Sequence, residues 1–128
     1  MRTKLVPIAV VLAVFGSTLV AGVASAGTPA DTRVTIKTQN GDFWGAVFTS
    51  RPLRCARERK IVVFHQLGAE QNPATDERIA SDLASLSGDR YEWNTGNTGR
   101  FGKFYARAGK TPDCKADSSE TVRSVRSP

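Results

Sequence analysis

The chain offers few residues whose types and spacing suit catalysis. His65 is its only histidine, and no second histidine, free cysteine or carboxylate pair lies at the spacing that a zinc site requires. The Gly-x-Ser-x-Gly motif of many serine hydrolases is absent. The acidic residues of segment 70–82 lack the alternating ligands of a calcium loop. The sequence therefore predicts a protein that is not an enzyme and binds no metal or cofactor, with His65 as a partly buried or strand-end residue.

The glycine-containing segment 94–100, NTGNTGR, does not match a nucleotide-binding loop either. This segment lacks the Lys-Ser/Thr ending of a phosphate-binding loop, and the residues after it read as a strand rather than a helix. We interpret it as a connection between strands.

Basic and aromatic residues point to binding instead of catalysis. The chain carries 18 Lys and Arg against 12 Asp and Glu, a formal net charge of +6. Aromatic rings beside cations suit sugar rings or an anionic polymer, through stacking and ion pairing. The candidate binding surface consists of Trp44, Arg54, Arg57, Lys103, Tyr105 and Arg107. The alternative is that these side chains only cover sheet edges or form a solvated charged surface.

The first 26 residues have the pattern of a cleaved secretory signal peptide. Arg2 and Lys4 precede a long apolar run, and small residues of an A-x-A site end at Ala26. An uncleaved membrane anchor is the alternative, because about 18 apolar residues can span a bilayer. Cleavage would leave 128 − 26 = 102 residues with a formal net charge of 6 − 2 = +4.

The expected product is a secreted protein with no membrane segment. Residues 27–32 are predicted to be a flexible leader, residues 33–125 a single domain, and residues 126–128 a frayed C-terminus. The absence of an N-x-S/T site fits a bacterial exported protein. We expect an anionic cell-wall polymer or an extracellular protein as the partner, since a modest positive charge is weak evidence for nucleic acid.

Two cysteines, Cys55 and Cys114, are predicted to form one disulfide. Export would place them in an oxidising compartment. Two free thiols or a metal pair would be the alternative, but no second pair of ligands accompanies them.

Alternation and turn signals predict short strands and no helix. The strand at residues 61–64, IVVF, is expected to be central because four consecutive residues are β-branched or aromatic. Segments 33–38 and 43–49 form a hairpin through Asn40-Gly41, a pair that favours the tight turn. Both faces of segment 43–49 are apolar, so its core face stays open. Segment 50–59 is predicted to be an exposed, charged connection.

Beyond the central strand, a polar loop at residues 66–76 leads into segment 77–83. A strand is favoured there, although the apolar spacing of residues 77–86 also fits a helix. A turn then leads to Tyr91 and Trp93, which we expect to fill the core. Further strands are predicted at residues 101–107 and 118–125. The predicted fold class is all-β: an antiparallel two-sheet sandwich of about seven strands, prealbumin- or immunoglobulin-like, with one disulfide.

The spacing of these strands resembles that of a known superfamily. The elements are Gly45-x-Val47, Arg59-x-Ile61-x-Val63, Ile79-x-Ser81-Asp82 with Ser85, Gly88 and Tyr91, and Gly102-x-Phe104-Tyr105-Ala106. Over about residues 42–107 this order resembles the transthyretin-like, carboxypeptidase-regulatory-like β-sandwich. The resemblance implies a structural, adhesive or partner-binding module without shared catalytic residues. The expected function is that of a secreted, non-enzymatic binding or structural module. The alternative is a small secreted effector or enzyme inhibitor that presents loop 66–76 or 94–100 to a protein target.

Overall fold

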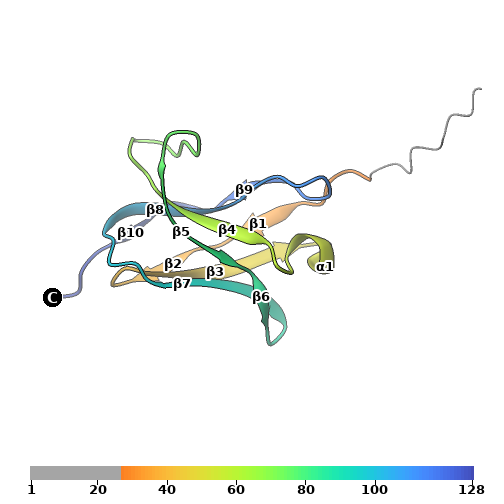
Figure 1. Ribbon diagram of the computed structural model, residues 1–128, viewed down its shortest axis with the longest axis horizontal. Coiled ribbons are helices and arrows are strands. Elements are labelled where there is room, and N and C mark those ends of the chain that lie inside the picture. Colours follow the sequence, from red (N-terminus) through yellow and green to blue (C-terminus); the bar gives the residue numbers. More distant parts are fainter. Residues whose placement is uncertain (1–26) are drawn as a thin grey trace, which may run out of the picture.

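The computed structural model describes residues 27–128, so the predicted signal peptide lies outside the described residues. Two antiparallel sheets stack on each other (Figure 1). The four-residue helix α1 (Pro52–Cys55) is the only helix in this part of the chain. The predicted all-β two-sheet sandwich is confirmed, with ten short strands in place of about seven.

The first sheet contains β1 (Thr32–Val34), β2 (Lys37–Gln39), β3 (Asp42–Thr49), β6 (Ser85–Ser87) and β7 (Arg90–Asn97). Its order is β1-β3-β7-β6, and β2 also pairs with β3. The second sheet contains β4 (Lys60–His65), β5 (Glu77–Leu83), β8 (Gly102–Ala108), β9 (Asp117–Ser118) and β10 (Val122–Ser124). Its order is β10-β8-β4-β5, with β9 on β8. The strand predicted to be central, β4, lies between β8 and β5.

The N-terminal hairpin forms as its sequence predicts, with one interruption. Asn40 and Gly41 both have positive φ, 50° and 84°, as the tight turn between β2 and β3 requires. The strand predicted at residues 33–38 is divided between β1 and β2. At the break, the Thr35 hydroxyl accepts a 2.9 Å hydrogen bond from the Ala46 amide.

This break brings the Thr35 backbone very close to Gly45 of β3. A Cβ atom at position 45 would lie 1.9 Å from the Thr35 carbonyl oxygen and 2.9 Å from Nε1 of Trp93. Only glycine fits there.

The core lies between the two sheets. Its buried members are Val34, Ile36, Phe43, Val47, Ala56, Ile61, Val63, Ala84, Trp93, Phe104, Ala106 and Ala108. The rings of Phe43 in β3 and Phe104 in β8 meet across the interface, with centroids 4.8 Å apart. The face of β3 that carries Phe43 and Val47 is therefore the core face. Trp93 is buried in this core and Tyr91 packs at its margin, as predicted.

Several segment boundaries differ from the sequence-based expectation. Residues 77–83 form strand β5, and after Ala84 the chain crosses to the first sheet as β6, so the helical alternative is wrong. The connection predicted at residues 94–100 is shorter, because β7 continues to Asn97 and pairs with β3. The strand predicted at residues 118–125 is two short strands, β9 and β10.

The predicted disulfide between Cys55 and Cys114 is confirmed. Both cysteines are fully buried and form a small apolar cluster with Ala30. Segment 50–59, predicted to be exposed, is only partly so: it contains α1, and Arg59 at its end is only 6% exposed. Arg59 is buried because its guanidinium is surrounded by the backbone carbonyls of Cys55, Gly109 and Lys115. Within residues 27–128, no helix has the length and apolar character needed to cross a bilayer.

Candidate functional site

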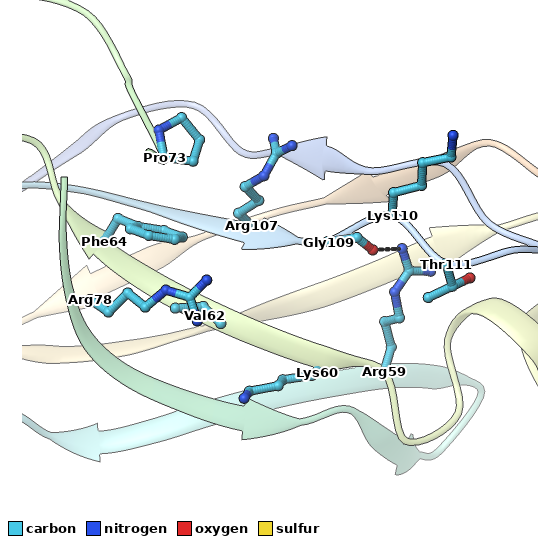
Figure 2. Close-up of a pocket in the computed structure, with 10 residues that line it drawn as sticks. All are labelled: Arg59, Lys60, Val62, Phe64, Pro73, Arg78, Arg107, Gly109, Lys110 and Thr111. Carbon is cyan, nitrogen blue, oxygen red and sulfur yellow. Dashed lines mark hydrogen bonds between the residues drawn. The ribbon is translucent and has the colours of Figure 1, made fainter. Parts of the chain in front are cut away.

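Strand β4 is apolar on both of its faces. Ile61 and Val63 point into the core, whereas Val62 and Phe64 point to the outer side of the second sheet (Figure 2). The exposed face of an antiparallel sheet is usually polar. On this face Phe64 pairs with Tyr105 of β8, and their rings stack with centroids 5.3 Å apart.

The loop of residues 66–76, between β4 and β5, covers these two rings and buries them. Asp76 at its end organises the cover. One carboxylate oxygen accepts hydrogen bonds from the Tyr105 hydroxyl at 2.6 Å and the Asn72 amide at 2.7 Å. The other accepts one from the Leu67 amide at 3.1 Å. The tyrosine bond is the main cause that lowers the pKa of Asp76, while burial, aided by this bond, raises the pKa of Tyr105.

Bonds to the rest of the second sheet fix the other parts of this loop. The Lys103 ammonium donates to the Gly68 carbonyl at 2.8 Å. The Gln71 amide group donates to the Ser119 carbonyl at 2.8 Å and to the Thr121 hydroxyl at 2.9 Å. The loop is therefore a preformed part of the fold.

A pocket of about 300 Å³ opens on the outer face beside this loop (Figure 2). Its lining consists of Arg59, Lys60, Val62, Phe64, Pro73, Arg78, Arg107, Gly109, Lys110 and Thr111. Five of these residues are Arg or Lys, and none is acidic. A second hollow of about 260 Å³ shares Lys60, Val62 and Arg78 and extends over β4 and β5. We call the two together the cationic groove.

The rim of the cationic groove carries positive charge that no carboxylate neutralises. Among residues 27–128, no ion pair involves Lys60, Arg78, Arg107 or Lys110. The Arg78 guanidinium lies 5.5 Å from the centroid of the Phe64 ring, and Arg107 donates to the Ser118 hydroxyl at 2.8 Å. Both contacts place the cations without removing their charge.

Arg59 is a buried cation at one end of the groove. Its Nη1 donates to the Cys55 carbonyl at 3.0 Å and lies 3.5 Å from the Thr32 hydroxyl. Its Nη2 donates to the Gly109 carbonyl at 2.7 Å (Figure 2) and to the Lys115 carbonyl at 3.0 Å. Every one of these partners is neutral. Burial lowers the pKa of Arg59, yet a guanidinium keeps its charge in proteins, and buried charges are normally paired with an opposite charge.

No protein-family model, curated protein or solved structure matches this chain. The geometry of the site is therefore the basis for assigning a function.

The structure does not bring together the six residues of the predicted binding surface. Arg107 lines the cationic groove. Lys103, on the same strand, is bonded to the covering loop. Tyr105 is fully buried, so its expected place on an exposed surface is wrong. The reason is that loop 66–76 covers its ring, which lies on the outer side of the sheet.

The other three residues of that surface lie elsewhere. Trp44 belongs to the first sheet and lines a separate hollow with Glu92 and Asn94, among others. Arg54 pairs with Asp113 at 3.1 Å, and Arg57 is exposed in the turn after α1.

The predicted binding surface omits four cations of the groove, Arg59, Lys60, Arg78 and Lys110. Arg59 and Lys60 end a basic cluster that the sequence assigns to a solvated connection. Lys60 also precedes Val62 by two residues in β4 and so shares its outer face.

His65 is a partly buried residue at the end of β4, as its position in the sequence predicts. Its side chain is 28% exposed, and its Nδ1 lies 3.3 Å from the Glu77 carboxylate. The ring stacks on Phe104 with centroids 4.9 Å apart. Arg100 also bonds Glu77, at 2.7 Å, and this bond is the main cause that lowers the pKa of Glu77. Across residues 27–128, no three His, Cys, Asp or Glu side chains are placed to hold a metal ion.

Proposed function

We propose that the protein is an exported, non-enzymatic binding module that holds an anionic ligand in the cationic groove. The observation that carries this proposal is the buried guanidinium of Arg59, which has only neutral partners and lines a pocket with four further cations. A bound anion would supply the missing negative charge.

The electrostatics of the groove favour such a ligand. Two unit charges 4 Å apart attract by about 1 kcal/mol in water and about 4 kcal/mol near a protein surface of lower effective dielectric constant. Several cations act on the same ligand here, and no acidic side chain lines the pocket. An anion that displaces water from the groove gains from each of them.

Export and a partner-binding role rest on separate support. The disulfide is compatible with an oxidising compartment outside the cytoplasm, while the signal peptide and the transthyretin-like resemblance stay predictions. An anionic cell-wall polymer would satisfy the charge of the groove. It therefore remains a candidate partner.

The proposal is tested by titrating residues 27–128, which contain both sheets and the disulfide, with short-chain polyphosphate in a calorimeter. Purified cell-wall material, assayed by co-sedimentation, is the second probe. We expect binding at physiological ionic strength that weakens as salt rises. R78E and K110E should each lower the affinity at least about tenfold, or about 1.4 kcal/mol.

R57E is the matched control, because Arg57 is an exposed arginine that does not line the groove. It changes the net charge by the same amount and should leave the affinity within about twofold. Equal losses in R57E and R78E would show that only the overall charge attracts anions. That result, or no binding of either probe, would refute the proposal.

A second candidate function, an effector or inhibitor, is favoured by one observation. Loop 66–76 is held in shape by Asp76 and presents Leu67, which is 61% exposed. A preformed loop binds a protein target at a lower entropic cost. Under this alternative, L67S would weaken binding to an extracellular protein target and leave anion binding unchanged. If L67S binds the extracellular protein target as tightly as the unaltered protein does, this second function is wrong.

A further inference from the structure

The cationic groove combines an apolar floor with a charged rim. Val62 and Phe64 form the floor and Pro73 closes one end. Figure 2 shows Arg107 and Lys110 on one side of Val62 and Lys60 on the other, with the guanidinium of Arg78 next to Val62. A ligand that is only an ion would make no use of this floor.

The floor is incompletely covered by the protein itself. Loop 66–76 buries Phe64 to 2% exposure. Val62, two residues earlier in β4 and on the same face, is left half-buried. Apolar surface that faces water is unfavourable, and it is stabilised by any apolar group that covers it.

The volume of the pocket also argues against a small inorganic ion as its complete occupant. One water occupies about 30 Å³ in the liquid, and a phosphate displaces only a few waters. A pocket of about 300 Å³ is at the lower end of the range for small organic ligands, which runs from about 300 to 1,000 Å³. A bare phosphate would leave water against Val62.

We propose that the ligand is an amphiphilic anion: an aromatic or short acyl group that carries a carboxylate, phosphate or sulfonate. Its apolar part covers Val62, the part of the floor that the protein leaves half-buried. Its anionic group lies toward Arg107 and Lys110, at the end of the groove where Arg59 is buried. This inference rests on the proposed function and specifies the chemistry of its ligand.

Three matched compounds test the inference by calorimetry on residues 27–128: phenyl phosphate, inorganic phosphate and phenol. We expect phenyl phosphate to bind at least about tenfold more tightly than either of the others, because only it uses both parts of the groove. V62T keeps the shape and the strand propensity of the side chain but replaces a methyl group by a hydroxyl group. It should weaken phenyl phosphate severalfold and leave inorganic phosphate unchanged.

K110Q should weaken phenyl phosphate and inorganic phosphate alike, and R57Q, outside the groove, should change neither. The comparison of the three compounds on the unaltered protein decides the inference even if V62T fails to fold.

Each other outcome has a distinct meaning. Equal affinity for phenyl phosphate and inorganic phosphate, or tighter binding of polyphosphate than of phenyl phosphate, would overturn the inference and leave the proposed function standing. Phenol binding as tightly as phenyl phosphate would overturn both, because the anion would then contribute nothing. Unchanged binding of phenyl phosphate to a folded V62T would overturn the placement over Val62. Failure of every anion to bind at millimolar concentration would likewise overturn both.

Discussion

Replacing Arg59 by methionine removes the donors that join three segments at the disulfide end of the sandwich. The guanidinium bonds the carbonyl of Cys55 at the end of α1 and those of Gly109 and Lys115, which flank the turn that carries Cys114. Methionine fills much of the volume of the arginine stem, so R59M creates little cavity. The substitution therefore isolates the effect of the lost hydrogen bonds.

The expected cost follows from these three bonds. A buried carbonyl left without a donor costs about 1–3 kcal/mol, so three carbonyls give about 3–9 kcal/mol. Part of this cost is offset, because methionine carries no charge that folding must transfer from water into the protein. We expect R59M to lower the free energy of unfolding by about 3 kcal/mol. A domain of 102 residues loses about 4–8 °C in Tm per kcal/mol, which gives a decrease of about 12–24 °C.

Circular dichroism during heating, and during urea titration at pH 7, measures both quantities. R57M is the control, because Arg57 is exposed and exposed positions usually change stability by less than about 0.5 kcal/mol. If the free energy of unfolding of R59M lies within about 1 kcal/mol of that of the unaltered protein, the three carbonyls find other donors. The role assigned to Arg59 is then refuted. An anion that stabilises the unaltered protein but not R59M would link this residue to the ligand.

Three further predictions concern the disulfide, a glycine and a carboxylate. Reducing Cys55–Cys114 should lower the free energy of unfolding by about 4 kcal/mol, because the bond closes a loop of about 60 residues; an unchanged melting curve in reductant would contradict this. G45A should fold poorly because its Cβ would overlap a carbonyl oxygen, whereas G68A, with open space around that position, should melt like the unaltered protein. The pKa of Asp76 is lower in the folded state than in the unfolded state, so its contribution to stability is complete above about pH 3.9 and is lost as the pH falls through the folded-state value. D76N should flatten this part of the curve of stability against pH, and an unchanged slope would show that other carboxylates produce it.

The features that the sequence predicts well depend on few and mostly local interactions. Asn40-Gly41 fixes a turn through the conformations that these two residues favour, and only one disulfide pairing exists for two cysteines. The errors arise where distant segments decide the structure. The strand at residues 33–38 is divided because Thr35 bonds Ala46 across the sheet. Residues 94–97 are a strand rather than a loop because β3 lies beside them, despite Gly96 and its positive φ.

The burial of Arg59 illustrates the same limit at the candidate site. A run of charged residues is usually solvated, and segment 50–59 is such a run. The structure buries Arg59 because carbonyls that follow it by 50 and 56 residues converge on it. No local pattern indicates that convergence, nor does any predict that Lys110 and Arg78 line one pocket.

The floor of the groove did leave a signal in the sequence. Residues 61–64 are apolar without alternation, and a strand of this kind needs a cover on both faces. The opposite sheet covers Ile61 and Val63, and loop 66–76 covers Phe64. Of the four residues 61–64, Val62 alone is left half-buried, and it lies at the bottom of the groove. A strand with more apolar residues than its own fold covers therefore indicates where a ligand with an apolar part can bind, while the charge of that ligand becomes apparent only from the assembled rim.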